Sequence, residues 1–148
     1  GRIGLIHSKS SSTRISEYGK MLQKLMSQGV NLIDPLEASD SESAMTVYSK
    51  YSLIISPHGS SMLNPLVMSR LPIVGLFPQL LFSRYAHHND TSQFSDIALL
   101  FGTRIYPVFG MPVDYDGSVL EINRAIDYPH TFCYETIMQT VYRVYGAL

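Results

Sequence analysis

Short apolar segments alternate with longer amphipathic segments along this chain, a pattern typical of α/β proteins. The apolar segments are each too short for a helix and are predicted to be buried strands: residues 3–6, 30–33, 53–55, 73–76 and 104–109. Because helical segments separate these strands, the pattern predicts a doubly wound, mostly parallel sheet with right-handed crossovers, as in a Rossmann-like fold.

The segments between the strands predict helices. A first helix is indicated by apolar residues that share one helical face: Tyr18, Met21, Leu22, Leu25 and Met26. Ser16 is the expected cap of this helix and Gly29 ends it. Further helices are expected over these segments: residues 44–51, 62–68 (with Pro65 in the first turn), 92–101 and 135–145. Residues 79–90 and 110–127 follow neither period and are predicted to be irregular.

Composition narrows the class of protein. The 148 residues, 45% hydrophobic and 16% charged, suit one globular domain and exclude a disordered tail, a collagen and a coiled coil. A net charge of −1 gives no electrostatic basis for binding nucleic acid or an anionic membrane. No apolar stretch is long enough to span a membrane. The single cysteine, Cys133, excludes an internal disulfide framework. Since the chain opens at Gly1 without Met, we interpret it as a domain excised from a longer protein.

Ligands of parallel sheets bind at the carboxyl ends of the strands, which points to two loops. One loop leads from a strand into a helix and holds six candidate phosphate-binding residues: Pro57, His58, Gly59, Ser60, Ser61 and Asn64. Gly59 allows a close approach of the backbone. The amides of Ser60 and Ser61 would lie at the helix start, where a phosphate fits. His58 adds a donor or a base. The alternative is an ordinary strand-to-helix turn with capping serines.

The other loop, residues 8–14, carries two cations among small hydroxyl residues. Lys9 and Arg14 together are suited to pair with a diphosphate. The alternative for this segment is a solvated surface loop.

Other residues suggest weaker candidate sites. His87 and His88 with Asp90 would form a metal site only if adjacent side chains pointed the same way, which is rare. Asp114 and Asp116 resemble the carboxylate pair of a metal–nucleotide site, but the neighbouring glycine and proline favour a plain turn.

Several familiar enzyme motifs are missing. A serine hydrolase would use Ser60 or Ser61, yet the chain has no G-x-S-x-G elbow. The absence of G-x-G-x-x-G argues against NAD binding. Asn89 begins a glycosylation acceptor triplet, which matters only in a secretory lumen.

Residues 53–59, then Asn64 and residues 76–78, resemble the C-terminal half of family 61 glycosyltransferases. Members of that family show a strand, then P-H-G-A-G-L-T-N, then a strand ending E-L-F-P. Residues 6–9 and 13–17 resemble the family's first strand with its Arg-rich loop and the N-E start of the following helix. Residues 82–106 resemble its tyrosine-rich segment, helix and strand. The likeness covers roughly residues 2–108, and the H-G core is its most specific part.

This resemblance implies a B-type glycosyltransferase with two Rossmann-like halves and the active site between them. Residues 1–148 would be the half that binds the nucleotide-sugar donor, commonly UDP-linked, for inverting transfer to a glycan or protein acceptor. Lys9 stands at a family Arg, and these residues match directly: Arg14, Pro57, His58, Gly59 and Asn64. The cations and amides would stabilise the departing diphosphate. His58 is the one candidate catalytic residue and more readily contacts the diphosphate, the base lying on the other half. A divalent metal is compatible with this interpretation but is not indicated by the residues.

Departures from the family pattern keep other functions open. Ser60 and Ser61 replace Ala and Gly, Ser16 replaces Asn, and Gly75 stands where the family usually has Glu. Gly75 favours an alternative, a non-catalytic nucleotide- or sugar-binding module of the same fold. A third reading is an unrelated, complete, doubly wound protein.

The resemblance also sets expectations about partners. The excised half alone is expected to be inactive, and its cleft face is expected to meet the missing N-terminal half or to self-associate. Five apolar residues are candidates for that face: Met62, Met68, Leu80, Leu81 and Phe82. The expected compartment is the secretory lumen in a eukaryote or the cytoplasm in a bacterium.

Overall fold

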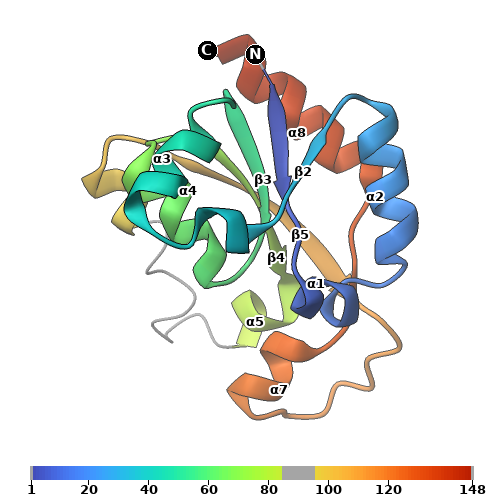
Figure 1. The fold of residues 1–148 in the computed structure, drawn as a ribbon. Helices are drawn as coiled ribbons and strands as arrows, with labels where there is room; N and C mark the ends of the chain where they lie inside the picture. The colour runs from blue at the N-terminus through green and yellow to red at the C-terminus, as the bar shows by residue number, and fades with distance from the viewer. Residues whose placement is uncertain (1, 85–95, 148) are drawn as a thin grey trace.

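A mostly parallel sheet of six strands forms the centre of the computed structural model, which describes residues 2–84 and 96–147 (Figure 1). The strand order is β2-β1-β3-β4-β5-β6. The strands are β1 (Ile3–Ile6), β2 (Asn31–Ile33), β3 (Leu53–Pro57), β4 (Ile73–Pro78), β5 (Ile105–Pro112) and β6 (His130–Thr131). Only β6, at one edge, is antiparallel to its neighbour. The predicted α/β class and mostly parallel sheet are confirmed, and the arrangement is compatible with a Rossmann-like fold.

Helices flank the sheet (Figure 1). The α-helices are α1 (Lys9–Arg14), α2 (Tyr18–Ser27), α3 (Ser41–Tyr48), α4 (Leu63–Met68), α5 (Gln79–Arg84), α7 (Ile122–Asp127) and α8 (Tyr134–Ala147). Two 3₁₀ turns, η1 (Pro35–Ala38) and η2 (Ser60–Met62), precede α3 and α4. Residues 96–100 are also helical. Among the described residues, none of the helices has the length and apolar character needed to cross a membrane.

The strands separate two hydrophobic clusters. Strand residues Leu5, Ile55 and Val74 pack with α2 and α8 on one face. Ile54 and Ile73 pack with α3 and α4 on the other. Each of these side chains is essentially inaccessible to solvent, and burial of a side chain of this size contributes about 1.5–3 kcal/mol. Covering both faces explains why the strands are continuously apolar in the sequence rather than alternating.

Three segments differ from the sequence predictions. The expected loop at residues 8–14 contains α1, and the segments expected to be irregular contain α5 and α7. Each of these helices has six residues, too few for an apolar stripe to show in the sequence. Such short helices depend on packing in the tertiary structure rather than on intrinsic propensity.

Helix boundaries are partly as predicted. Gly29, with φ of 87°, follows the end of α2, and Pro65 lies in the first turn of α4. Ser16 is not the cap of α2: that position is held by Glu17, with φ of 54°. The Ser16 backbone N–H instead donates to the His130 carbonyl at 2.8 Å, so a contact 114 residues away in the sequence shifts the helix start by one residue.

Candidate functional site

The sheet changes direction between β1 and β3. The chain passes from β1 to β2 on one side and then crosses to β3 on the other side of β1. In open α/β sheets, ligands bind outside the carboxyl ends of the strands at such a point. Here β1 leads into α1 and β3 leads into η2, so the two loops predicted from the sequence lie at this point.

A cavity of about 440 Å³ opens between these two segments. Its described lining consists of Ser8, Ser10, Ser11, Arg14, Pro35, Pro57, His58, Gly59, Ser60, Ser61 and Asn64. Seven of the eight candidate residues are therefore brought together, Lys9 being the exception. The lining combines five hydroxyls, an amide, an imidazole and a guanidinium, and it includes no carboxylate. Such a surface suits an anionic, oxygen-rich ligand.

Lys9 is exposed and lies outside the lining, whereas Arg14 belongs to it. The reason is that this segment is helical. Ser10 and Arg14 are four residues apart, so they share the helix face that lines the cavity. Lys9 lies between two lining residues, Ser8 and Ser10, but is itself exposed and outside the lining. Its carbonyl accepts a hydrogen bond from the Ser12 hydroxyl at 2.7 Å. The two cations therefore do not form the pair that the sequence suggested.

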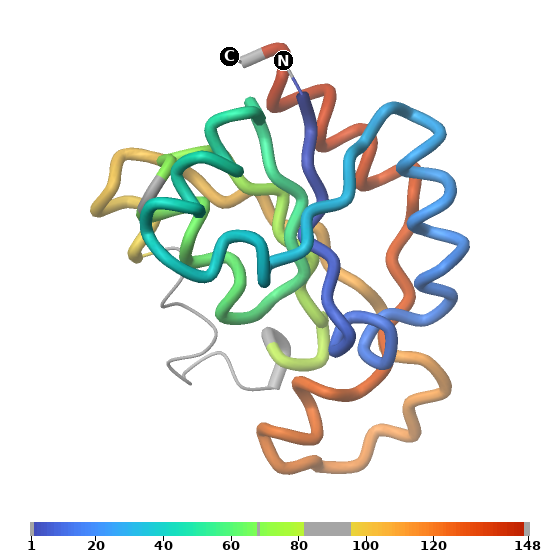
Figure 2. The backbone as a smooth tube through the Cα atoms, in the orientation of Figure 1, coloured from blue at the N-terminus to red at the C-terminus, as the bar shows by residue number. Residues whose placement is uncertain are grey.

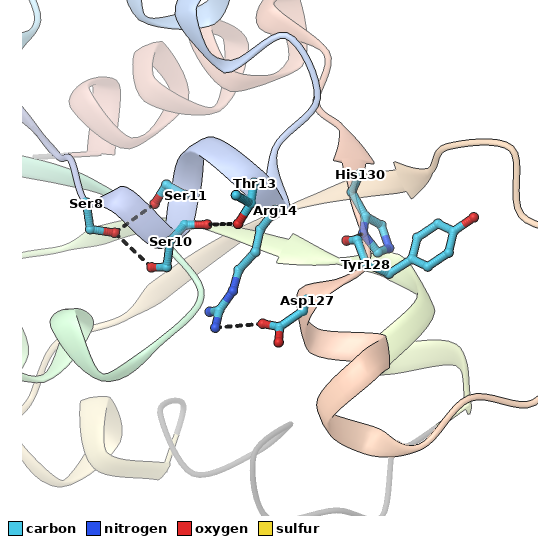
Figure 3. Close-up of polar contacts among 8 residues, drawn as sticks. All are labelled: Ser8, Ser10, Ser11, Thr13, Arg14, Asp127, Tyr128 and His130. Atoms are coloured by element: carbon cyan, nitrogen blue, oxygen red, sulfur yellow. Dashed lines mark hydrogen bonds and ion pairs between the residues drawn. The ribbon is translucent and has the colours of Figure 1, made fainter.

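Arg14 pairs instead with Asp127, at the end of α7 (Figure 3). The guanidinium Nη2 lies 2.8 Å from the carboxylate Oδ1, and the side chains are 32% and 63% exposed. Figure 2 shows residues 113–121 leading away from the sheet and α7 returning beside α1. The sequence analysis missed Asp127, and no local signal marks it, because 113 residues separate it from Arg14.

His58 and Gly59 shape the other wall. The His58 backbone N–H donates to the Leu76 carbonyl at 2.9 Å, which extends the pairing of β3 with β4. The centroid of the His58 ring lies 5.4 Å from that of the Phe77 ring. Gly59 has φ of 151° and ψ of 178°, a conformation that is essentially limited to glycine. A Cβ added there would meet nothing within 4 Å, so the backbone conformation, not crowding, requires glycine.

Asn64 lines the cavity and also fixes its shape. Its side-chain amide donates to the carbonyl of Ala38, at the end of η1, at 2.9 Å. The helix predicted to begin at Met62 begins one residue later, at Leu63. Met62 is the last residue of the preceding 3₁₀ turn, Ser60–Met62. The Met62 N–H donates to the Gly59 carbonyl at 3.1 Å within this turn.

Gly75, the position of the expected family Glu, is a buried residue of β4. A Cβ built on it would lie 2.5 Å from Cε2 of Phe77 and 3.1 Å from Cγ2 of Ile105. The Phe77 ring thus occupies the space that a side chain would need. The space that a glutamate side chain would occupy here is therefore filled by neighbouring side chains.

His130 is a buried histidine that the sequence analysis did not single out. Its Nδ1 donates to the Tyr128 carbonyl at 2.7 Å and its Nε2 accepts from the Leu80 backbone N–H. These contacts require the neutral ring. Burial lowers the pKa of His130 below its ordinary value of 6.5. His130 also lines a small apolar space of about 20 Å³ together with Arg14 and His58.

We expect His130 to make the fold less stable in mild acid. As the pH falls below 6.5, the unfolded chain takes up the histidine proton before the folded chain does. The unfolding free energy therefore decreases through the window between 6.5 and the lower folded-state pKa. Urea unfolding at a series of pH values measures this slope.

His130→Gln and His130→Asn provide the comparison. Neither amide titrates, so both variants should lose this part of the pH dependence, whatever their absolute stability. An unchanged slope in both variants would assign the acid sensitivity to other groups.

The weaker candidates do not form a site in the described part of the chain. His87, His88, Asp90 and the triplet at Asn89 lie outside the described residues. Asp114 and Asp116 are exposed on a turn. A hydrogen bond from the Ser118 N–H to Asp116 lowers the pKa of that carboxyl, which supports the turn interpretation. Residues 2–84 and 96–147 hold no cluster of three or more His, Cys, Asp or Glu suited to a metal.

The expected apolar cleft face is corrected for three of its five residues. Met62, Leu80 and Leu81 are at most 2% exposed and belong to the interior. The side chains of Met68 and Phe82 lie outside what the structure describes. Met62, Leu80 and Leu81 follow the ends of β3 and β4, where short helical segments bury their apolar side chains in the interior.

Fold and cavity together define the chain as an α/β protein with a polar, ligand-sized cavity at the carboxyl ends of a mostly parallel sheet. No protein-family model matches the sequence, and no curated protein matches it either.

Proposed function

We propose that this chain is the donor-binding half of an inverting glycosyltransferase and that its cavity holds the diphosphate of a nucleotide sugar, most simply a UDP-sugar. The observation that carries the proposal is the carboxylate-free cavity at the switch point of the sheet, lined by Arg14, His58 and five serines. The likeness of residues 53–59, Asn64 and residues 76–78 to family 61 glycosyltransferases supports it independently.

The chemistry of this lining suits a leaving diphosphate. Arg14 offers a planar fork of donors that matches phosphate oxygens in a bidentate way. The serine hydroxyls add neutral donors, and His58 lies at the wall formed by the end of β3. Donors fixed in advance around a departing diphosphate stabilise the charge that develops on it. Without a ligand the Arg14 guanidinium pairs with Asp127, so a bound phosphate would take the place of this carboxylate.

In the proposed enzyme, a second Rossmann-like half supplies the acceptor site and the base that removes a proton from the acceptor hydroxyl. The acceptor is a glycan or a protein. His58, at the donor side, then contacts the diphosphate and does not act as that base. On this proposal the chain alone binds donor but transfers no sugar.

A second candidate is a non-catalytic nucleotide- or sugar-binding module of the same fold. The observation that favours it is Gly75 itself: this residue of β4 lacks the carboxylate expected from the family, and the Phe77 ring fills the space that a side chain would take. Binding alone does not separate the two candidates. UDP release from UDP-sugars by the longer protein does, because only the transferase accelerates it.

Titration with UDP, GDP, CMP and NAD, followed by backbone amide shifts, tests donor binding. UDP is expected to shift the amides of Ser10, Arg14 and residues 58–61, and His58→Ala is expected to weaken these shifts. Ser12→Ala, an exposed serine of α1 outside the lining, is the matched control and should bind as wild type does. Absence of shifts at these residues with all four ligands, in a folded sample, would reject the cavity as a donor site.

A further inference from the structure

A small apolar recess adjoins the cavity at the carboxyl ends of β3 and β4. Its volume is about 20 Å³, and Arg14, Pro57 and His58 line both the recess and the cavity. Helix α7 connects the two spaces: Asp127 pairs with Arg14, and the preceding residue, Ile126, lines the recess. A ligand held in the cavity therefore lies beside the recess.

The recess is lined mostly by hydrocarbon side chains. Six of its nine described residues are apolar: Ile15, Pro57, Leu76, Pro78, Ile126 and Phe132. His130 also lines the recess, and both of its ring nitrogens are already engaged. Nδ1 lies 2.7 Å from the Tyr128 carbonyl oxygen, and Nε2 lies 3.4 Å from the Leu80 backbone nitrogen. These side chains therefore offer a ligand little opportunity for hydrogen bonding.

The recess has a buried floor and a partly exposed rim. Ile15, Leu76 and His130 are at most 3% exposed and form the floor. Ile126 and Phe132 are only half-buried, as are the three residues that the recess shares with the cavity. The recess therefore opens beside the cavity, so that a side group of a bound ligand can enter it.

The size and the lining of the recess select the group that fits. A space of about 20 Å³ holds a single group of about the size of a water molecule. An ordered water needs about two to four polar partners, which hydrocarbon side chains do not supply. A methyl group needs no such partners and is stabilised by leaving water.

We propose that the recess is a methyl-binding subsite for the donor sugar, so that the chain prefers a nucleotide sugar that carries a methyl group to one that carries none. The inference rests on the proposed function, because a diphosphate in the cavity is what brings the sugar to the recess. Two kinds of sugar share this chemistry. An N-acetylamino sugar carries the methyl on its acetamido group, and a 6-deoxy sugar carries it in place of the hydroxymethyl group.

Three donors measure this preference. UDP-glucose has no methyl group, whereas UDP-N-acetylglucosamine and UDP-6-deoxyglucose each carry one at a different carbon of the same ring. One methyl-bearing donor is expected to bind about 4- to 20-fold more tightly than UDP-glucose, as for burial of one methyl group in an apolar pocket. Calorimetric titration gives the Kd values, and the donor that gains affinity identifies the source of the methyl. Its methyl protons should show nuclear Overhauser contacts to Ile126 and Phe132.

Three variants test whether the recess causes the preference. Ile126→Phe fills the recess from its rim and should bring the Kd values of the methyl-bearing donor and UDP-glucose together. Ile126→Ala enlarges the recess and should shift the preference to the homologue with an ethyl group in place of the methyl. Ile122→Phe makes the same change one turn earlier on α7, outside the described lining of both spaces, and should keep the wild-type preference. Because the readout is a ratio of Kd values, a general loss of affinity does not imitate the effect.

The outcomes separate the inference from the proposed function. If UDP-glucose binds at least as tightly as both methyl-bearing donors, or if the preference survives Ile126→Phe, the inference is overturned and the proposed function stands. If UDP and all three donors leave the amides of the cavity residues unshifted, both are overturned.

Discussion

Arg14→Gln is expected to weaken UDP binding by about 10- to 100-fold, the effect of losing charge-assisted hydrogen bonds to a phosphate. Arg14 is the single cation among the described residues of the cavity lining, so no neighbouring cation replaces it. Because the side chain is 32% exposed, the loss should shrink as salt is added. Calorimetric titration with UDP at two salt concentrations measures both effects.

Lys9→Gln is the matched control for Arg14→Gln. It removes the same charge from the same helix, but Lys9 is exposed and outside the lining. We expect a change of less than about threefold, since only a screened, long-range attraction is lost. Equal losses in the two variants would show that α1 acts through its net charge and would remove the structural argument for Arg14.

Asp127→Asn should act in the opposite direction. The Asp127 carboxylate lies 2.8 Å from Arg14 and competes with a phosphate for the same donors. Its removal is expected to tighten UDP binding by several-fold, and the double variant with Arg14→Gln should bind as weakly as Arg14→Gln alone. Weaker binding in Asp127→Asn would show that this carboxylate positions Arg14 more than it competes.

Gly75→Ala is expected to lower the unfolding free energy by about 1–3 kcal/mol, although it adds only a methyl group. The new Cβ would lie 2.5 Å from the Phe77 ring and 3.1 Å from Ile105, inside a packed sheet. Urea unfolding measures the loss. Gly75→Glu should cost more, because a carboxylate would be buried as well, and it is not expected to restore a functional glutamate.

Gly19→Ala is the control for Gly75→Ala. Gly19 is exposed on α2, and an added Cβ meets nothing within 4 Å. Alanine should therefore stabilise this helix by about 0.5–1 kcal/mol. If crowding by Phe77 is the cause at Gly75, Gly75→Ala should cost less in a Phe77→Leu background. An equal cost in both backgrounds would place the strain elsewhere.

The sequence by itself determined the class of fold and the location of the cavity. Buried parallel strands are apolar on both faces, so they appear in the sequence as short apolar runs. Such runs can be identified without knowing which strands pair with each other. The rule that ligands lie at the carboxyl ends of strands then selected residues 8–14 and 57–61. Gly29 and Pro65 also act locally, through the backbone conformations they allow, and both lie where the sequence placed them.

The tertiary structure alone decided which side chains meet at the cavity. Lys9 and Arg14 look equivalent in the sequence, and the short helix α1 turns only Arg14 toward the cavity. Asp127 and His130 reach this region from more than 110 residues further along the chain than Arg14. Such contacts depend on how elements pack, and packing leaves no period in the local sequence. Gly75 is a further example. The sequence shows only that it lacks a side chain, and the packing of the sheet decides that the Phe77 ring fills this space.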